Sequence, residues 1–136
     1  MLAFDFGTRR IGVAVGNTLV RVAHPLATID DESSTRRFTA IAALVDEWKP
    51  GMLVVGIPVH ADGTPHAMTA RARRFARQLH GRHRLPVVEA DERWTTQDAQ
   101  SALDAAGRGG RRGRGLRDAI AAQAILQGYF DEPGQR

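Results

Sequence analysis

Three acidic positions lie where short apolar segments end or begin. Asp5 closes the first apolar run and is the only carboxylate among the first 29 residues. Asp91 and Glu92 follow the apolar run Pro86–Ala90, and Asp118 precedes an alanine-rich apolar segment. A carboxylate beside a buried element costs free energy unless it is paired, hydrogen-bonded or bound to a cation. These acids are therefore the first candidates for a functional site.

Convergence of Asp5, Glu92 and Asp118 would require a divalent cation, because three neighbouring carboxylates repel one another. The chain has no cysteine, and a ligand set made only of oxygens favours Mg²⁺ or Mn²⁺. Such ions stabilise the attacking and leaving oxygens when a phosphodiester is cleaved. The acids therefore indicate metal-dependent phosphodiester hydrolysis.

Each acid also has a purely structural alternative. Asp5 could accept hydrogen bonds from the turn over residues 7–10, and Glu92 could pair with a nearby arginine. Asp118 could be an acid in the first turn of a helix, where it complements the helix dipole. Spacing along the chain does not decide whether the three acids meet.

The first half of the chain predicts three strands and a helix. The strands cover 2–6, 11–15 and 20–29, with short turns that indicate antiparallel hairpins and with Pro25 placing the third strand at a sheet edge. A polar cluster at 30–34 caps the following helix, which ends at residues 49–51. The expected apolar stripe of this helix is Phe38, Ile41, Val45 and Trp48.

The second half alternates strands and helices. The apolar run 52–57 is typical of a central strand, Pro65 can open the next helix, and 86–90 forms another strand. The expected stripe of that helix is Met68, Ala72, Phe75, Ala76 and Leu79, and its arginines are interpreted as solvated. Thr95 or Thr96 caps a helix that runs to residue 106, residues 107–115 form a flexible glycine-arginine loop, and a last helix covers 118–130.

This order, β-β-β-α-β-α-β-α-α, predicts an α/β fold with a mixed five-stranded sheet and helices on both faces. We expect one domain over residues 1–130 and a tail over 131–136. No apolar stretch approaches the roughly 20 residues that span a bilayer, and no signal peptide is evident. We therefore expect a cytoplasmic protein without membrane contact.

The basic residues are almost all arginine. Lys49 is the only lysine among 19 basic residues, and the pI is about 10.9. Arginine offers paired donors that suit phosphate groups, although a genome-wide bias explains the overall excess equally well. Clustering is more informative, because five arginines lie within ten residues just before the last helix: Arg108, Arg111, Arg112, Arg114 and Arg117.

With these features in view, the chain resembles the YqgF/RuvX family, which is described both as Holliday junction resolvases and as pre-16S rRNA nucleases. The matching stretches occur in the family's order: AFDFGTRRIGVAVGN, AHPLATI, LVVGIP, ADG, DERWTT and DAIAAQAILQGYF. The resemblance implies a ribonuclease H-like fold whose first three strands are antiparallel.

The resemblance also implies roles for individual residues. Asp5, Glu92 and Asp118 correspond to the family's catalytic acids and would hold two Mg²⁺ or Mn²⁺ ions, with Asp91 as an undecided extra ligand. Arg10 and Arg93 would contact phosphate. Separately from the resemblance, a flexible basic loop beside a nuclease centre can bind a nucleic-acid backbone without reading its sequence, and we expect this of Arg108, Arg111, Arg112 and Arg114.

The implied function is metal-dependent hydrolysis of phosphodiesters in pre-16S rRNA, with branched DNA such as Holliday junctions as a further substrate and ribosomal precursor particles as partners. A monomer and a homodimer both remain open. The main alternative is a non-catalytic nucleic-acid-binding module of the same fold. An actin-like ATPase, which shares the DFGT turn, would need two such lobes, and this chain is long enough for one.

Overall fold

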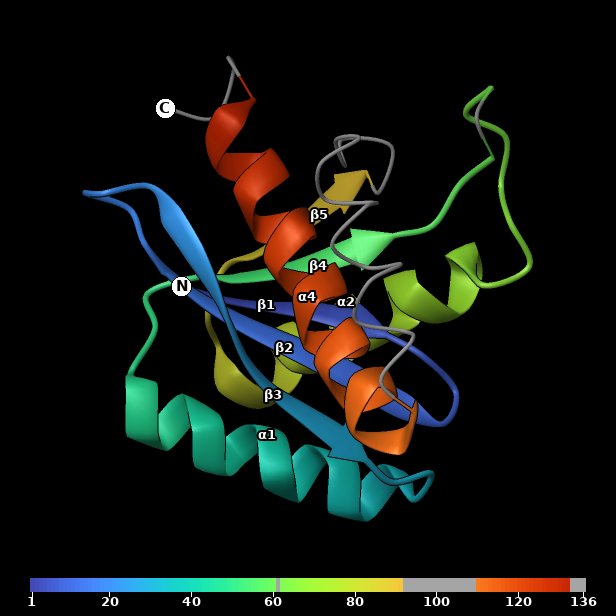
Figure 1. The fold of residues 1–136 in the computed structure, drawn as a ribbon, viewed down its shortest axis with the longest axis horizontal. Coiled ribbons are helices and arrows are strands. Elements are labelled where there is room, and N and C mark those ends of the chain that lie inside the picture. Colours follow the sequence, from blue (N-terminus) through green and yellow to red (C-terminus); the bar gives the residue numbers. More distant parts are fainter. Residues whose placement is uncertain (61, 92–109, 133–136) are drawn as a thin grey trace.

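The computed structural model describes residues 1–60, 62–91 and 110–132 of the chain. Figure 1 shows a central twisted sheet with one long helix lying across it. The described elements are β1 (Leu2–Phe6), β2 (Arg10–Asn17), β3 (Val22–Asp30), α1 (Ser34–Trp48), β4 (Leu53–Ile57), α2 (Thr69–His83), β5 (Val87–Asp91) and α4 (Gly110–Asp131).

The sheet has five strands in the order β3-β2-β1-β4-β5. β1, β2 and β3 pair antiparallel, whereas β4 and β5 join them in parallel. This arrangement confirms the expected mixed sheet with three antiparallel strands first. β3 lies at the sheet edge and has a neighbouring strand on one side only. The missing N–H of Pro25 is therefore tolerated there.

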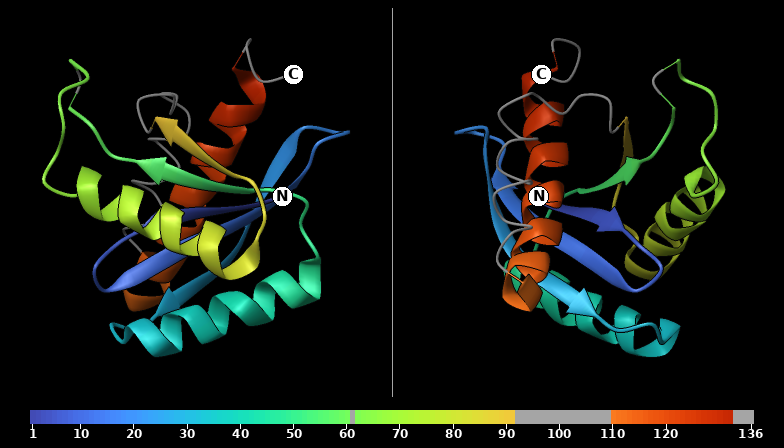
Figure 2. Two further views of the ribbon diagram at one scale, coloured as in Figure 1. Left: turned by 180° about the vertical axis from the view of Figure 1, so that it is seen from behind. Right: turned by 45° about the vertical axis from the view of Figure 1, so that its right-hand side comes forward.

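Helices cover both faces of the sheet, as Figure 2 shows from two further directions. Strand alternation sends Leu2 and Phe4 of β1 toward α1 and α2, and Ala3 toward α4. β4 is buried along its whole length because it lies between these two layers. The expectation of an α/β fold with helices on both faces is therefore confirmed. Among the described residues, no helix is long and apolar enough to cross a membrane.

Helix α1 begins and ends close to the positions that its sequence indicates. The Ser33 hydroxyl accepts a hydrogen bond from the Arg36 N–H, and Lys49 ends the helix in the left-handed conformation at φ 45°. Phe38 and Ile41 are buried as expected. Trp48 was expected in the same stripe, but it is 43% exposed. Trp48 is the last residue of α1, and it lines a surface pocket rather than the core.

The start of α2 differs from the prediction. Pro65 does not open this helix, because it pairs with Val59 in an isolated β-bridge. The helix begins at Thr69, whose hydroxyl donates to the Pro58 carbonyl and accepts from the His66 N–H. These bonds fix the start of the helix at Thr69, four residues after Pro65. Ala72, Phe75, Ala76 and Leu79 are buried as predicted, whereas Met68, expected in the same stripe, precedes the helix and is only partly buried.

The start of α4 is the largest correction. Residues 107–115 were expected to form a flexible loop, but residues 110–115 form the first turns of the helix. Asp118 therefore stands eight residues after Gly110, beyond the reach of the helix dipole's first turn, so that alternative role is wrong. Residues of the segment Ala119–Phe130 pack on the sheet and stabilise the helix, and each further helical residue gains a hydrogen bond that helps to offset the cost of glycine. The helix predicted up to residue 106 lies outside the described residues.

Candidate active site

Helix α4 packs directly on β2 because three residues on that face of the strand are small. Gly12, Ala14 and Gly16 alternate along β2. A Cβ added at Gly12 would lie 1.9 Å from the Asp118 carbonyl oxygen, and one added at Gly16 would lie 2.8 Å from a side-chain carbon of Leu126. At Gly12 the helix backbone therefore touches the strand with no side chain between them.

Asp5 lies next to this contact. It is the Cα partner of Gly12 in the antiparallel pairing of β1 and β2. Because it alternates with Phe4 and shares a face with Ala3, its side chain lies on the α4 side of the sheet. Asp5 is half-buried. Gly12 is thus a shared neighbour of Asp5 and Asp118, two acids far apart in the sequence.

Asp118 is held by an ion pair with Arg10. The Arg10 Nε donates to Asp118 Oδ2 at 2.6 Å. The side chains are 33% and 24% exposed, respectively, so water reaches the pair only in part. This bond joins the first residue of β2 to the helix that crosses it. It also provides the Asp118 carboxylate with a compensating positive charge.

The described residues supply two of the three expected acids on one face of the sheet. Two half-buried carboxylates with only oxygen donors suit a hard divalent cation. Within residues 1–60, 62–91 and 110–132, no group of three or more His, Cys, Asp or Glu side chains gathers in a metal-binding arrangement. Glu92, the third expected acid, lies just beyond the described end of β5.

Asp91 lies on the other face of the sheet. In β5, Ala90 packs toward α4, whereas Glu89 pairs with Arg73 of α2. Alternation along the strand therefore directs Asp91 to the α2 face, opposite Asp5. The structure does not bring Asp91 together with Asp5 and Asp118.

The predicted phosphate-binding arginines are described unequally. Arg10 is at the site, bonded to Asp118. Arg93 and Arg108 lie outside the described residues. Arg111, Arg112 and Arg114 belong to the first turns of α4, upstream of Asp118 on the same helix, rather than to a loop.

Gly12 is the residue at this site that the sequence interpretation missed. Its signal was present as small residues at positions 12, 14 and 16, alternating with Val13 and Val15. Such a pattern in a strand indicates close approach of another backbone. The partner helix could not be identified from that pattern.

Comparison with known proteins gives consistent results along the whole chain. Residues 1–132 match the family model RuvX, described as Holliday junction resolvase. A protein from Nitrosomonas europaea named "putative pre-16S rRNA nuclease" is 56% identical over 131 residues, covering 96% of this chain and 88% of its own length. A protein of the same name from Chromobacterium violaceum is 53% identical over 134 residues, covering 98% of both chains.

Solved structures with the same architecture include Thermus thermophilus RuvC bound to a Holliday junction substrate. The TM-score is 0.56 at 16% sequence identity, and the match covers 96% of this chain and 93% of that one. A second Thermus thermophilus RuvC structure gives the same TM-score at 14% identity. At such low identity the similarity concerns the fold, and it confirms the expected ribonuclease H-like architecture.

Proposed function

The chain belongs to the RuvX family of Holliday junction resolvases, and we propose that it is a divalent-metal-dependent nuclease that hydrolyses phosphodiester bonds in structured nucleic acid. One observation supports this most directly. Helix α4 meets β2 at Gly12, and this contact brings Asp118 to the same face as Asp5. The active site of the single domain over residues 1–130 is centred there.

Asp5 and Asp118 would hold the metal, together with Glu92. When bound, Mg²⁺ or Mn²⁺ supplies positive charge that stabilises the attacking and leaving oxygens of the phosphodiester. The β1–β2 ladder fixes the backbone of Asp5, and the close helix contact fixes the backbone of Asp118, so both carboxylates extend from rigid elements. Arg10 orients Asp118 through Nε and contacts the substrate phosphate through its Nη groups.

The arginines that begin α4 would bind the phosphate backbone on either side of the cleaved bond. Arg111, Arg112 and Arg114 lie within the two turns that precede Asp118. Backbone contacts of this kind release counterions, so they contribute affinity that falls with rising salt and carries no sequence preference. Replacing the three with glutamine is expected to weaken binding and to flatten its salt dependence. An unchanged salt slope would remove these residues from the interface.

The substrate we propose is pre-16S rRNA, within ribosomal precursor particles in the cytoplasm. The names of the relatives support this assignment, while the family description supports a branched DNA junction. The deciding assay offers the protein an rRNA precursor and a four-way DNA junction at equal concentration, with Mg²⁺ and with Mn²⁺. Faster cleavage of the precursor is expected. Cleavage of the junction alone would assign the DNA substrate.

The catalytic assignment is tested with paired variants. Asp5→Asn and Asp118→Asn are each expected to reduce cleavage by a factor of about 10³ or more, since each would lose a charged metal ligand. Asp46→Asn, an exposed acid on α1, is the matched control and should cleave normally. Cleavage that survives Asp5→Asn would refute the assignment. Binding without cleavage in either metal would support a non-catalytic binding module instead.

A further inference from the structure

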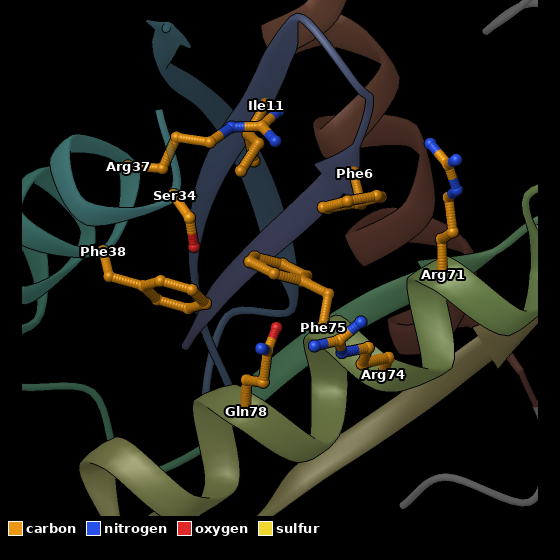
Figure 3. A pocket seen from close by; sticks show the side chains of 9 residues that line it. All are labelled: Phe6, Ile11, Ser34, Arg37, Phe38, Arg71, Arg74, Phe75 and Gln78. Atoms are coloured by element: carbon orange, nitrogen blue, oxygen red, sulfur yellow. The ribbon is translucent and has the colours of Figure 1, made fainter. Parts of the chain in front are cut away.

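A cationic site lies on the opposite face of the sheet from Asp5 and Asp118. It is a pocket with a volume of about 400 Å³ between α1, α2 and the adjoining ends of β1 and β2. Figure 3 shows its side chains from close by. Its chemistry comes from two groups of residues, the arginines and the aromatic rings: Arg37, Arg71, Arg74, Phe6, Phe38 and Phe75.

Arg37 is a buried cation at the wall of this pocket. The residue is only 8% exposed, and its Nη2 donates to the Gly7 carbonyl oxygen. Its guanidinium also lies over the Phe6 ring, 5.2 Å from the centroid. The Arg37 Nε is buried without a hydrogen-bond partner among the described residues. Burial lowers the pKa of Arg37, although the charges of Asp31 and Glu32 partly oppose this effect. A guanidinium held at this cost would be stabilised by an anion beside it.

Two further arginines from α2 line the same pocket. Arg71 and Arg74 stand one turn apart on that helix, so their side chains extend from the same side of it. Neither forms an ion pair with another described residue, in contrast to Arg73, which pairs with Glu89. No acidic side chain of the described residues lines the pocket. Three guanidiniums and no carboxylate match a phosphate group better than a singly charged anion.

Three aromatic rings line the pocket as well, together with Ile11, Ser34 and Gln78. The Phe6 and Phe75 ring centroids are 4.8 Å apart, and those of Phe38 and Phe75 are 6.0 Å apart. These rings lie beside the arginines rather than in a separate region of the surface (Figure 3). Phe38 and Phe75 are buried, whereas Phe6 is partly exposed. A partly exposed aromatic ring next to clustered arginines can bind a base together with its phosphate.

We propose that this pocket binds a nucleotide, with its phosphate at the arginines and its base against Phe6, the partly exposed ring. Phe6 follows Asp5 directly on β1 but points to the other face, and Arg37 is bonded to Gly7 in the turn beyond it. The site is therefore separate from the carboxylates and close to them around the end of one strand. The nucleotide can be a free molecule or one unit of a nucleic-acid strand.

The test measures binding by calorimetry and by amide chemical shifts of the full chain, with EDTA present to exclude cleavage. The probes are adenosine 5′-monophosphate, ribose 5-phosphate, adenosine and a 5′-phosphorylated uridine hexamer. Arg71→Gln and Arg74→Gln are expected to weaken binding about tenfold each, since each removes a charge-assisted hydrogen bond. Arg77→Gln, an exposed arginine on the same helix outside this pocket, is the matched control. Arg37→Gln is included with a thermal melt to confirm folding.

Each outcome decides the proposal. A site for a free nucleotide is supported if adenosine monophosphate binds more tightly than ribose 5-phosphate or adenosine, and if Arg71→Gln and Arg74→Gln weaken this binding while Arg77→Gln does not. Binding only of the hexamer with the same arginine dependence supports one unit of a strand. Equal binding of ribose 5-phosphate and adenosine monophosphate, or equal weakening by Arg77→Gln, overturns it. So does the absence of binding by every probe. These results are independent of cleavage, so they hold or fail separately from the proposed nuclease activity.

Discussion

Replacing Gly12 with alanine should separate the two halves of the active site. The added Cβ would lie 1.9 Å from the Asp118 carbonyl oxygen, whereas ordinary contact begins at 3.4 Å. Both groups belong to the backbones of packed elements, so no flexible side chain can move aside. Helix α4 must withdraw by about 1.5 Å, and it must do so at the position that holds Asp118 near Asp5.

The expected destabilisation is about 3 kcal/mol, the upper end of the range for overpacked cores, because the helix loses contact with the sheet as it moves. For a domain of this size that corresponds to a melting temperature lower by roughly 10 °C. Gly16→Ala should cost less, about 1 kcal/mol, since its nearest atoms are side-chain carbons of Leu126 and Phe130 that can rotate away. Cleavage by Gly12→Ala should fall with the displacement of Asp118 even at temperatures where the variant is folded.

The control is Gly81→Ala. Gly81 lies within α2, and an added Cβ there meets nothing within 4 Å. Alanine should therefore raise stability by about 0.5–1 kcal/mol through helix propensity. Urea denaturation of the three variants measures the series directly. The reasoning is refuted if Gly12→Ala is as stable as the wild type, or if Gly16→Ala proves the more damaging of the two strand substitutions.

Three other perturbations follow from the described contacts. Asp118→Asn should lower the free energy of unfolding by less than about 1 kcal/mol, since its ion pair is partly exposed; a loss of several kcal/mol would show that this carboxylate is structural. Gln127→Ala removes two hydrogen bonds from α4 to the edge backbone, one of them at the Ala23 N–H, and should cost about 1–3 kcal/mol with faster amide exchange at Ala23; unchanged exchange there would contradict this. The pKa of His83 is lowered below 6.5, chiefly by burial and secondly by the charge of Arg82. The unfolded chain therefore binds the proton more readily than the folded chain, and the free energy of unfolding falls as the pH falls below 6.5. The drop in melting temperature between about pH 7.5 and about pH 5.5 should therefore be smaller in His83→Gln than in the wild type, and an equal drop would exclude the effect.

Much of the fold could be predicted because its evidence is local. Strand and helix order follow from the spacing of apolar residues, and Pro25 marked the edge strand since a missing N–H cannot be tolerated between two ladders. The errors occurred where local signals compete. Pro65 favours a helix start, but it pairs with Val59 in an isolated β-bridge instead. The glycines of residues 110–115 favour a loop, but a helix anchored on the sheet extends through them.

The residue types available at the site can be read from the chain alone: acids at the ends of apolar elements, and arginines near them. Tertiary structure decided which of them meet. Arg10 and Asp118 are separated by 108 positions, and Asp91 was assigned to the face away from Asp5 only once the sheet was assembled. Arg71 and Arg74 are exposed, as expected, but only the packing of α1 and α2 places them in one pocket with the buried Arg37. Local periodicity reports backbone conformation and one buried face, whereas a site depends on packing between distant segments, which no short window of the chain contains.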